Sequence, residues 1–144
     1  MINTMNPDVV MTVIANVLKA DVTLREHLGD ANRVFLWRFP NEQPSKYILL
    51  TLYPFDPNDM GIRSGELRVY VYTKLLSNGM IDSSGNVIVS RCEELLNNVS
   101  PPSLAGGCIL NVMTLGTIPS LHDLQDKSHA KGVLRLRIEA GLNG

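Results

Sequence analysis

Two segments in which apolar and polar side chains alternate constrain the fold of this chain more than any other feature of its sequence. Residues 67–72 read LRVYVY, and residues 133–140 read VLRLRIEA. Because successive side chains of a β-strand point to opposite faces of the sheet, each segment predicts a strand with one apolar and one more polar face. We therefore expect a sheet that is covered on one side and partly accessible on the other.

The remaining periodicity places two main helices around this sheet. Apolar residues recur at helical spacing over 7–20, and a second apolar stripe of this kind covers roughly 87–98 before the prolines at 101 and 102 end it. Other segments predict one short helix and three further strands, at 23–28, 33–39, 47–53 and 108–115. Strands grouped in this way predict an α+β fold: an antiparallel or mixed sheet of about five strands, with two main helices packed on one face.

Composition and charge limit the class of protein. The 144 residues carry a formal net charge of −1, with 44% hydrophobic and 19% charged residues. This balance predicts one globular domain over 1–144 and argues against a strongly basic nucleic-acid-binding domain. Two cysteines do not make a disulfide framework, and the N-terminus lacks a signal-peptide pattern, so we expect a cytosolic origin. The apolar runs are too short to cross a bilayer, so no membrane partner is expected.

No pattern typical of catalysis or of cofactor binding is found in the sequence. A phosphate-binding loop ending in Gly-Lys-Ser/Thr and a dinucleotide-binding fingerprint are both missing. Cys92 lies on the apolar stripe of a predicted helix, where a thiol is usually an inert core residue. We therefore predict a protein that is not an enzyme, with no catalytic residue and no cofactor.

One group of residues leaves an enzymatic alternative open. If residues 121–130 formed a helix, His122, Asp126 and His129 would share one face, and two imidazoles with a carboxylate can hold a metal ion. The simpler interpretation is a solvated loop that carries charges of both signs. A small metal-dependent enzyme is therefore kept as a remote alternative, while the main prediction contains no metal site.

Cations and aromatic residues share the polar faces of the predicted strands. Arg135 and Arg137 project from one strand, and Arg68 lies on another beside Tyr70 and Tyr72. These residue types suit contact with single-stranded nucleic acid or with an acidic protein surface. A solvated outer face explains the same pattern, so the sequence leaves both interpretations open.

Two connections, 54–65 and 119–131, are close to the length at which structureless loops become uncommon in compact domains. Long loops on a small scaffold are usually functional or disordered, so we predict that these two contact other subunits or partner proteins. The candidate interface residues are Asp56, Asp59, Arg63, Tyr70, Tyr72, Asp123, Asp126, Lys127 and Lys131.

Several features follow one another along most of the chain in a recognisable order. They are the amphipathic N-terminal helix, the short segment 24–28, the strand start Arg33-Val34-Phe35, the strand 47–50, a loop ending in Gly65, the strand 67–73, the helix 87–96 and the long alternating strand 132–140. In this order and in length the chain resembles the phage tail terminator and tail-completion (head–tail joining) protein family.

The resemblance implies a structural virion protein that forms a ring, typically a hexamer, on the end of the tail tube. Such a ring ends tube polymerisation and joins the tail to the head-side connector, and DNA passes through its lumen without sequence-specific binding. The implied partners are further copies of the chain, the tail tube protein and the head-side connector protein. The implied location is the tail–neck junction of the virion, and the host cytoplasm during assembly. A head-side connector or stopper protein is the alternative within the same structural class.

Overall fold

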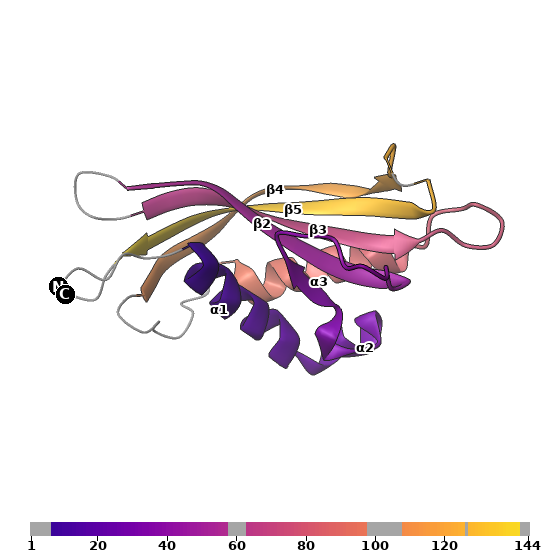
Figure 1. Ribbon diagram of the computed structural model, residues 1–144, viewed down its shortest axis with the longest axis horizontal. Helices are drawn as coiled ribbons and strands as arrows, with labels where there is room; N and C mark the ends of the chain where they lie inside the picture. The colour runs from indigo at the N-terminus through magenta and orange to yellow at the C-terminus, as the bar shows by residue number, and fades with distance from the viewer. Residues whose placement is uncertain (1–6, 58–62, 98–107, 126, 142–144) are drawn as a thin grey trace.

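The computed structural model describes residues 7–57, 63–97, 108–125 and 127–141, and Figure 1 shows how their helices and strands are arranged. In chain order the elements are α1 (Pro7–Ala20), α2 (Val22–Leu28), the 3-10 turn η1 (Ala31–Arg33), β1 (Val34–Leu36), β2 (Lys46–Pro57), β3 (Arg63–Lys74), α3 (Ser84–Leu96), β4 (Cys108–His122) and β5 (His129–Gly141). None of the described helices is long and apolar enough to cross a membrane.

The strands form one five-stranded sheet in the order β1-β2-β3-β5-β4. Strand β1 runs parallel to β2, and the other neighbouring pairs are antiparallel. Figure 1 shows α1, α2 and α3 together on one side of this sheet. The predicted α+β class, the mixed sheet of about five strands and the helices on one face are therefore confirmed.

The hydrophobic core lies between the three helices and the face of the sheet that they cover. Its sheet side is built from alternate residues of the strands, such as Leu50, Val69 and Leu134, each fully buried. Its helix side comes from residues at helical spacing, such as Ile14 and Ile88. The period of two in the strands and the period near 3.6 in the helices meet in this one layer.

The strand β2 and its partner β3 are longer than the sequence predicted. Strand β2 continues through Pro54 to Pro57, and β3 already begins at Arg63. A shift of register between Tyr53 and Asp56 lies at the proline, and such a bulge lets a strand tolerate a residue without a backbone N–H. The prediction of a loop over 54–65 was therefore wrong for most of its length.

The last two strands also exceed their predicted bounds. Strand β4 extends to His122 rather than to residue 115, and β5 begins at His129. The predicted loop over 119–131 is therefore only the short connection 123–128. By contrast, the strand predicted over 33–39 stops at Leu36, because Trp37 turns the chain with a φ of 65°.

Strand β4 forms one edge of the sheet, and its backbone is poorly suited to accept a further strand. Three register shifts interrupt its pairing with β5, and Pro119 carries no backbone N–H. Two asparagine side chains accept backbone N–H groups of this strand. Asn97, at the C-terminal end of α3, accepts that of Thr114 through Oδ1 at 3.0 Å, and Asn86, within α3, accepts that of Ser120 through Oδ1 at 2.8 Å. Bulges, proline and satisfied donors are the usual means by which natural sheets prevent edge-to-edge pairing.

The junction between the helices depends on one carboxylate. Asp21 precedes α2, and its side chain accepts the backbone N–H of Leu24 at 2.8 Å, which is an N-cap. The same carboxylate accepts hydrogen bonds from Nε and Nη2 of Arg91 on α3, at 2.9 and 2.7 Å. Hydrogen bonding from Arg91 is the main cause that holds the pKa of Asp21 below its ordinary value.

Replacing this carboxylate separates its two roles. We expect Asp21→Ala to lower the free energy of unfolding by about 1–2 kcal/mol, because the cap of α2 is lost together with the tie to α3. Asp21→Asn retains a capping oxygen and loses the ionic contact, so its loss should be smaller. Urea unfolding at pH 7 measures both, and equal losses for the two variants would show that the cap contributes nothing.

Candidate interaction surface

The face of the sheet that the helices leave uncovered carries an aromatic cluster. Tyr47 and Tyr72 stack with ring centroids 4.9 Å apart, and Phe39 meets Tyr72 edge-on at 5.5 Å. Phe35 and Tyr70 pack against this cluster and are partly buried. We call this side of the sheet, formed by alternate residues of β2, β3, β4 and β5, the open face.

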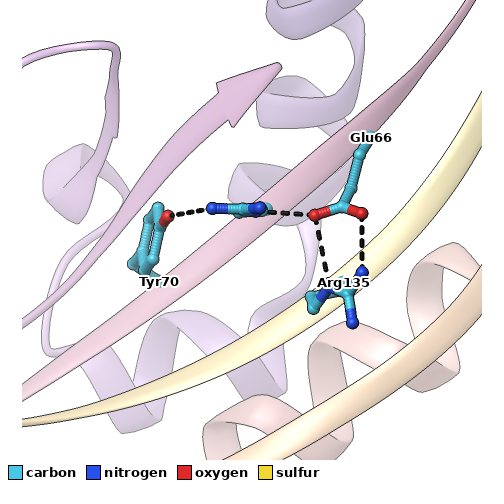
Figure 2. A network of polar contacts seen from close by, with 4 residues as sticks. Glu66, Tyr70 and Arg135 are labelled. Atoms are coloured by element: carbon cyan, nitrogen blue, oxygen red, sulfur yellow. Dashed lines mark hydrogen bonds and ion pairs between the residues drawn. The ribbon is translucent and has the colours of Figure 1, made fainter. Parts of the chain in front are cut away.

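Next to the aromatic cluster, one carboxylate joins two arginines on neighbouring strands. Glu66 Oε1 and Oε2 accept hydrogen bonds from Arg135 at 2.8 and 3.2 Å, and Oε2 also accepts one from Nε of Arg68 at 2.6 Å. Figure 2 shows Glu66 and Arg135 in this network, which continues through the second guanidinium to the hydroxyl of Tyr70, 3.5 Å from Nη1 of Arg68.

The register of the strands explains why this carboxylate is needed. Arg68 on β3 lies directly opposite Arg135 on β5, and like charges in this position destabilise a sheet. Glu66 compensates both charges from the next position on the same face. The hydrogen bonds from Arg135 and Arg68 lower the pKa of Glu66 to about 2, so the carboxylate is ionised at neutral pH.

A hollow of about 580 Å³ lies on the open face beside this network. It is lined by side chains of β3, β4 and β5 and by the β4–β5 connection: Arg68, Tyr70, Ile118, Leu121, His122, Asp123, Leu124, Gln125, Lys131, Val133 and Arg135. Ile118 and Leu121 are 44% and 54% exposed, whereas Val133 is nearly buried. The Nζ of Lys131 lies 5.6 Å from the centre of the Tyr70 ring. The hollow therefore combines apolar walls with cations at its rim.

Three interface residues were predicted on the first connection, and the structure describes two of them, Asp56 and Arg63. Asp56 belongs to β2 and pairs with Ser64, and Arg63 is the first residue of β3 and is partly buried. Asp59 lies outside the described residues. Asp56 and Arg63 belong to paired antiparallel strands rather than to a long loop, and the role of all three residues at an interface stays a prediction.

The residues predicted on the second connection differ in exposure. Lys127 is exposed and Lys131 is partly buried on β5. Asp123 is only 8% exposed, and its carboxylate accepts the backbone N–H of Gln125 at 3.1 Å, which is a turn contact. Asp126 lies outside the described residues. Asp123 is therefore largely buried by a turn contact in a short connection, and its role at an interface stays a prediction.

The two tyrosines of β3 also differ. Tyr70 is partly exposed at the hollow, whereas Tyr72 is 3% exposed beneath Phe39 and beside Tyr47. The segment between β1 and β2 turns back over the sheet and covers this side chain. The alternating pattern places both tyrosines on the more polar face and suggests that both are exposed there, which is wrong for Tyr72, so a base of single-stranded nucleic acid cannot stack on that ring.

The helix on which the metal alternative depends does not form. Residues 121 and 122 end β4, and 129 and 130 begin β5, so the two imidazoles follow strand geometry. His122 Nε2 lies 3.2 Å from the carbonyl oxygen of Gly79, and His129 is buried with Nε2 3.4 Å from that of Pro44. Among the described residues, no group of three His, Cys, Asp or Glu side chains is placed to hold a metal ion.

The cysteine predicted on the apolar stripe of a helix is a core residue, as expected. Cys92 is fully buried on α3, and burial raises the pKa of its thiol to about 12. A thiol of this kind does not ionise near neutral pH and is a poor nucleophile.

Glu66 and the apolar residues of β4 belong to this surface but were not among the residues predicted for it. Glu66 immediately precedes the alternating segment 67–72. Extending the alternation by one residue would have placed its charge on the same face as Arg68. Leu121 falls in the segment predicted as a loop, and Ile118 lies between that segment and the strand predicted over 108–115. Extending the strand pattern past Gly116 and Pro119 would have placed them on the open face.

The geometry defines a class: an α+β domain with helices on one face of a mixed sheet and an apolar, cationic surface on the other. The sequence matches no protein-family model and no curated protein. One solved structure with a similar chain is described as "Virion of native gene transfer agent (GTA) particle". The two chains share 14% sequence identity with a TM-score of 0.74, over 96% of this chain and 98% of that chain. At this identity the likeness establishes the fold.

Proposed function

We propose that this chain is a non-enzymatic structural protein of a phage-like virion, of the tail terminator type. All of residues 1–144 would form one subunit of a ring, with six copies as the expected number, on the end of the tail tube. The ring ends tube polymerisation and joins the tail to the head-side connector, at the tail–neck junction. DNA passes through its lumen without sequence-specific binding.

The observation that carries the proposal is the shared fold with a chain of a gene transfer agent virion, over 96% of this chain. The order of elements that resembles the tail terminator family supports the finer assignment. The one-sided sheet adds a physical argument, because a subunit that leaves an apolar and cationic face uncovered is suited to contact another protein.

Removing the gene from the genetic element that encodes it tests this function. We expect particles with filled heads that are separate from their tails, and tail tubes longer than normal, because tube growth is no longer ended. Electron microscopy of the lysate measures both, with the gene supplied from a plasmid as the control. Tails of normal length next to heads that have lost their DNA would contradict the terminator assignment and favour the head-side connector or stopper.

A further inference from the structure

The open face has the composition of a protein interface. Met113, Ile118 and Leu121 of β4 are each 44–54% exposed, and they lie on the same side of the sheet as Tyr70 and Val133. Charged side chains surround these apolar groups: Lys74, Lys131, Arg68, Arg135 and Arg137, against Glu66 and Glu139. Cations exceed carboxylates on this face, although the whole chain is close to neutral. A partner for this surface should therefore be acidic and partly apolar.

The outer surface of α3 has the complementary character. The residues of this helix that face away from the core include Val87, Ser90 and Glu94, and Val87 is 49% exposed. Glu93 and Glu94 both lie in the last turn of α3, which has no basic residue. The C-terminus of a helix carries partial negative charge, so two carboxylates in this place are unfavourable for the isolated helix.

The charges inside the subunit only partly offset this arrangement. Arg91 contacts Glu94 at 2.9 Å, but the same guanidinium also binds Asp21 through two hydrogen bonds. The side chain of Glu94 remains 67% exposed. The end of α3 therefore presents negative charge to solvent. The exposed side chain of Val87 lies about two turns before Glu94 on the same side of the helix.

We propose that the open face receives the outer surface of α3 from a second copy of this chain. The valine side would meet the apolar hollow, and the last turn of the helix would meet the cations of β5. The sheet would then lie between its own helices and a helix of its neighbour, so that both of its faces are buried, as in layered α/β structures. The inference rests on the proposed ring and names the surfaces that form it.

The two surfaces differ, so the contact is head-to-tail and not two-fold symmetric. Each subunit offers one helix surface and one sheet face, and repetition of the contact either closes a ring or continues as a filament. The edge of β4 is not required, which agrees with the bulges and satisfied donors along it.

Exchange of charge between the two surfaces tests the proposal on the full chain. One variant carries Glu93→Lys and Glu94→Lys, and the other carries Lys131→Glu and Arg137→Glu. Neither set includes the Glu66 network or the buried core, so the monomer should fold, and circular dichroism checks this. Arg38→Glu, at an exposed residue outside α3 and outside the strands of the open face, is the matched control.

Light scattering over a concentration series should show a ring for the wild type and the control, and each charge variant should need at least roughly tenfold higher concentration to assemble. An equimolar mixture of the two variants should recover the wild-type behaviour, because in an alternating ring every contact again joins opposite charges. Recovery by the mixture is an outcome that a merely unstable variant cannot produce.

Three results would overturn the inference: assembly of the charge variants at wild-type concentration, no recovery in the mixture, or a wild-type chain that remains monomeric throughout. Any of them leaves the proposed function to be decided separately, since the deletion experiment depends on tail length and head joining rather than on this contact. Binding of the monomer to another virion protein, lost in the variants, would assign the open face to that protein instead.

Discussion

Leu134→Ala should lower the free energy of unfolding by about 2–5 kcal/mol, which is the range for deleting a large aliphatic side chain from a rigid core. Leu134 is fully buried on β5, opposite Val69 of β3, in the layer that the helices cover. The cavity left behind is enclosed by a strand on either side and by the helices, so the surroundings have little room to collapse.

The neighbouring residue provides a matched control for this effect. Val133 precedes Leu134 on the same strand, but its side chain points to the open face, where the helices provide no cover. Val133 is only 7% exposed, but Val133→Ala should cost about 1.5 kcal/mol or less, because it removes fewer carbon atoms than Leu134→Ala and water from the adjoining hollow can fill the space. Urea unfolding of both variants at one low protein concentration measures the difference. Equal losses would contradict a sheet whose two faces are so differently packed.

Glu66→Gln should destabilise the protein by about 1–2 kcal/mol at pH 7. The variant leaves Arg68 and Arg135 opposite each other without the carboxylate that compensates them. The Glu66 side chain is 20% exposed, so solvent screens part of the interaction and the loss stays below that of a fully buried pair. Glu139→Gln, on the same face and in the more exposed pair with Arg137, should cost much less.

The effect of Glu66 also depends on pH in a defined direction. The pKa of this carboxyl is lowered from an ordinary value of 4.5 to about 2 in the folded protein. Its contribution to stability is therefore complete above about pH 4.5 and is lost as the pH falls towards 2. The difference in unfolding free energy between wild type and Glu66→Gln should narrow over this interval. A difference that stays constant from pH 6 to about pH 3 would show that the ionised carboxylate is not its source.

Local patterns were sufficient to predict the elements and their layers. The alternation in 67–72 and 133–140 reports directly which side chains are buried, and so it predicts both the strands and the covered face. The apolar stripes of α1 and α3 do the same for the helices. The boundaries were predicted less well, because Pro54 and Pro119 were interpreted as strand breakers, whereas bulges at or next to both residues retain them within strands.

The candidate surface depends on relations that the local sequence does not contain. Glu66 and Arg135 are 69 residues apart and meet only through the register of β3 on β5. The hollow likewise requires β4 to follow β5 past Pro119, which brings Ile118 beside Val133. Burial of Tyr72 requires the segment after β1 to fold back over the sheet. Each of these features is a product of tertiary packing, not of residue type or spacing.

The bulges, proline and satisfied donors at the edge of β4 have a consequence for how the protein behaves at high concentration. Aggregates can grow when a strand of one molecule pairs with the exposed sheet edge of another. This pairing needs only backbone N–H and C=O groups and tolerates many sequences, so it is a common route to irreversible aggregation at high concentration. Here Asn86 and Asn97 already accept N–H groups that a foreign strand would need, and Pro119 has none to give. A concentrated solution of this protein should therefore resist polymerisation through the backbone of this strand. Any contact that does form along this edge would have to be made by side chains, whose pairing is selective, rather than by the backbone.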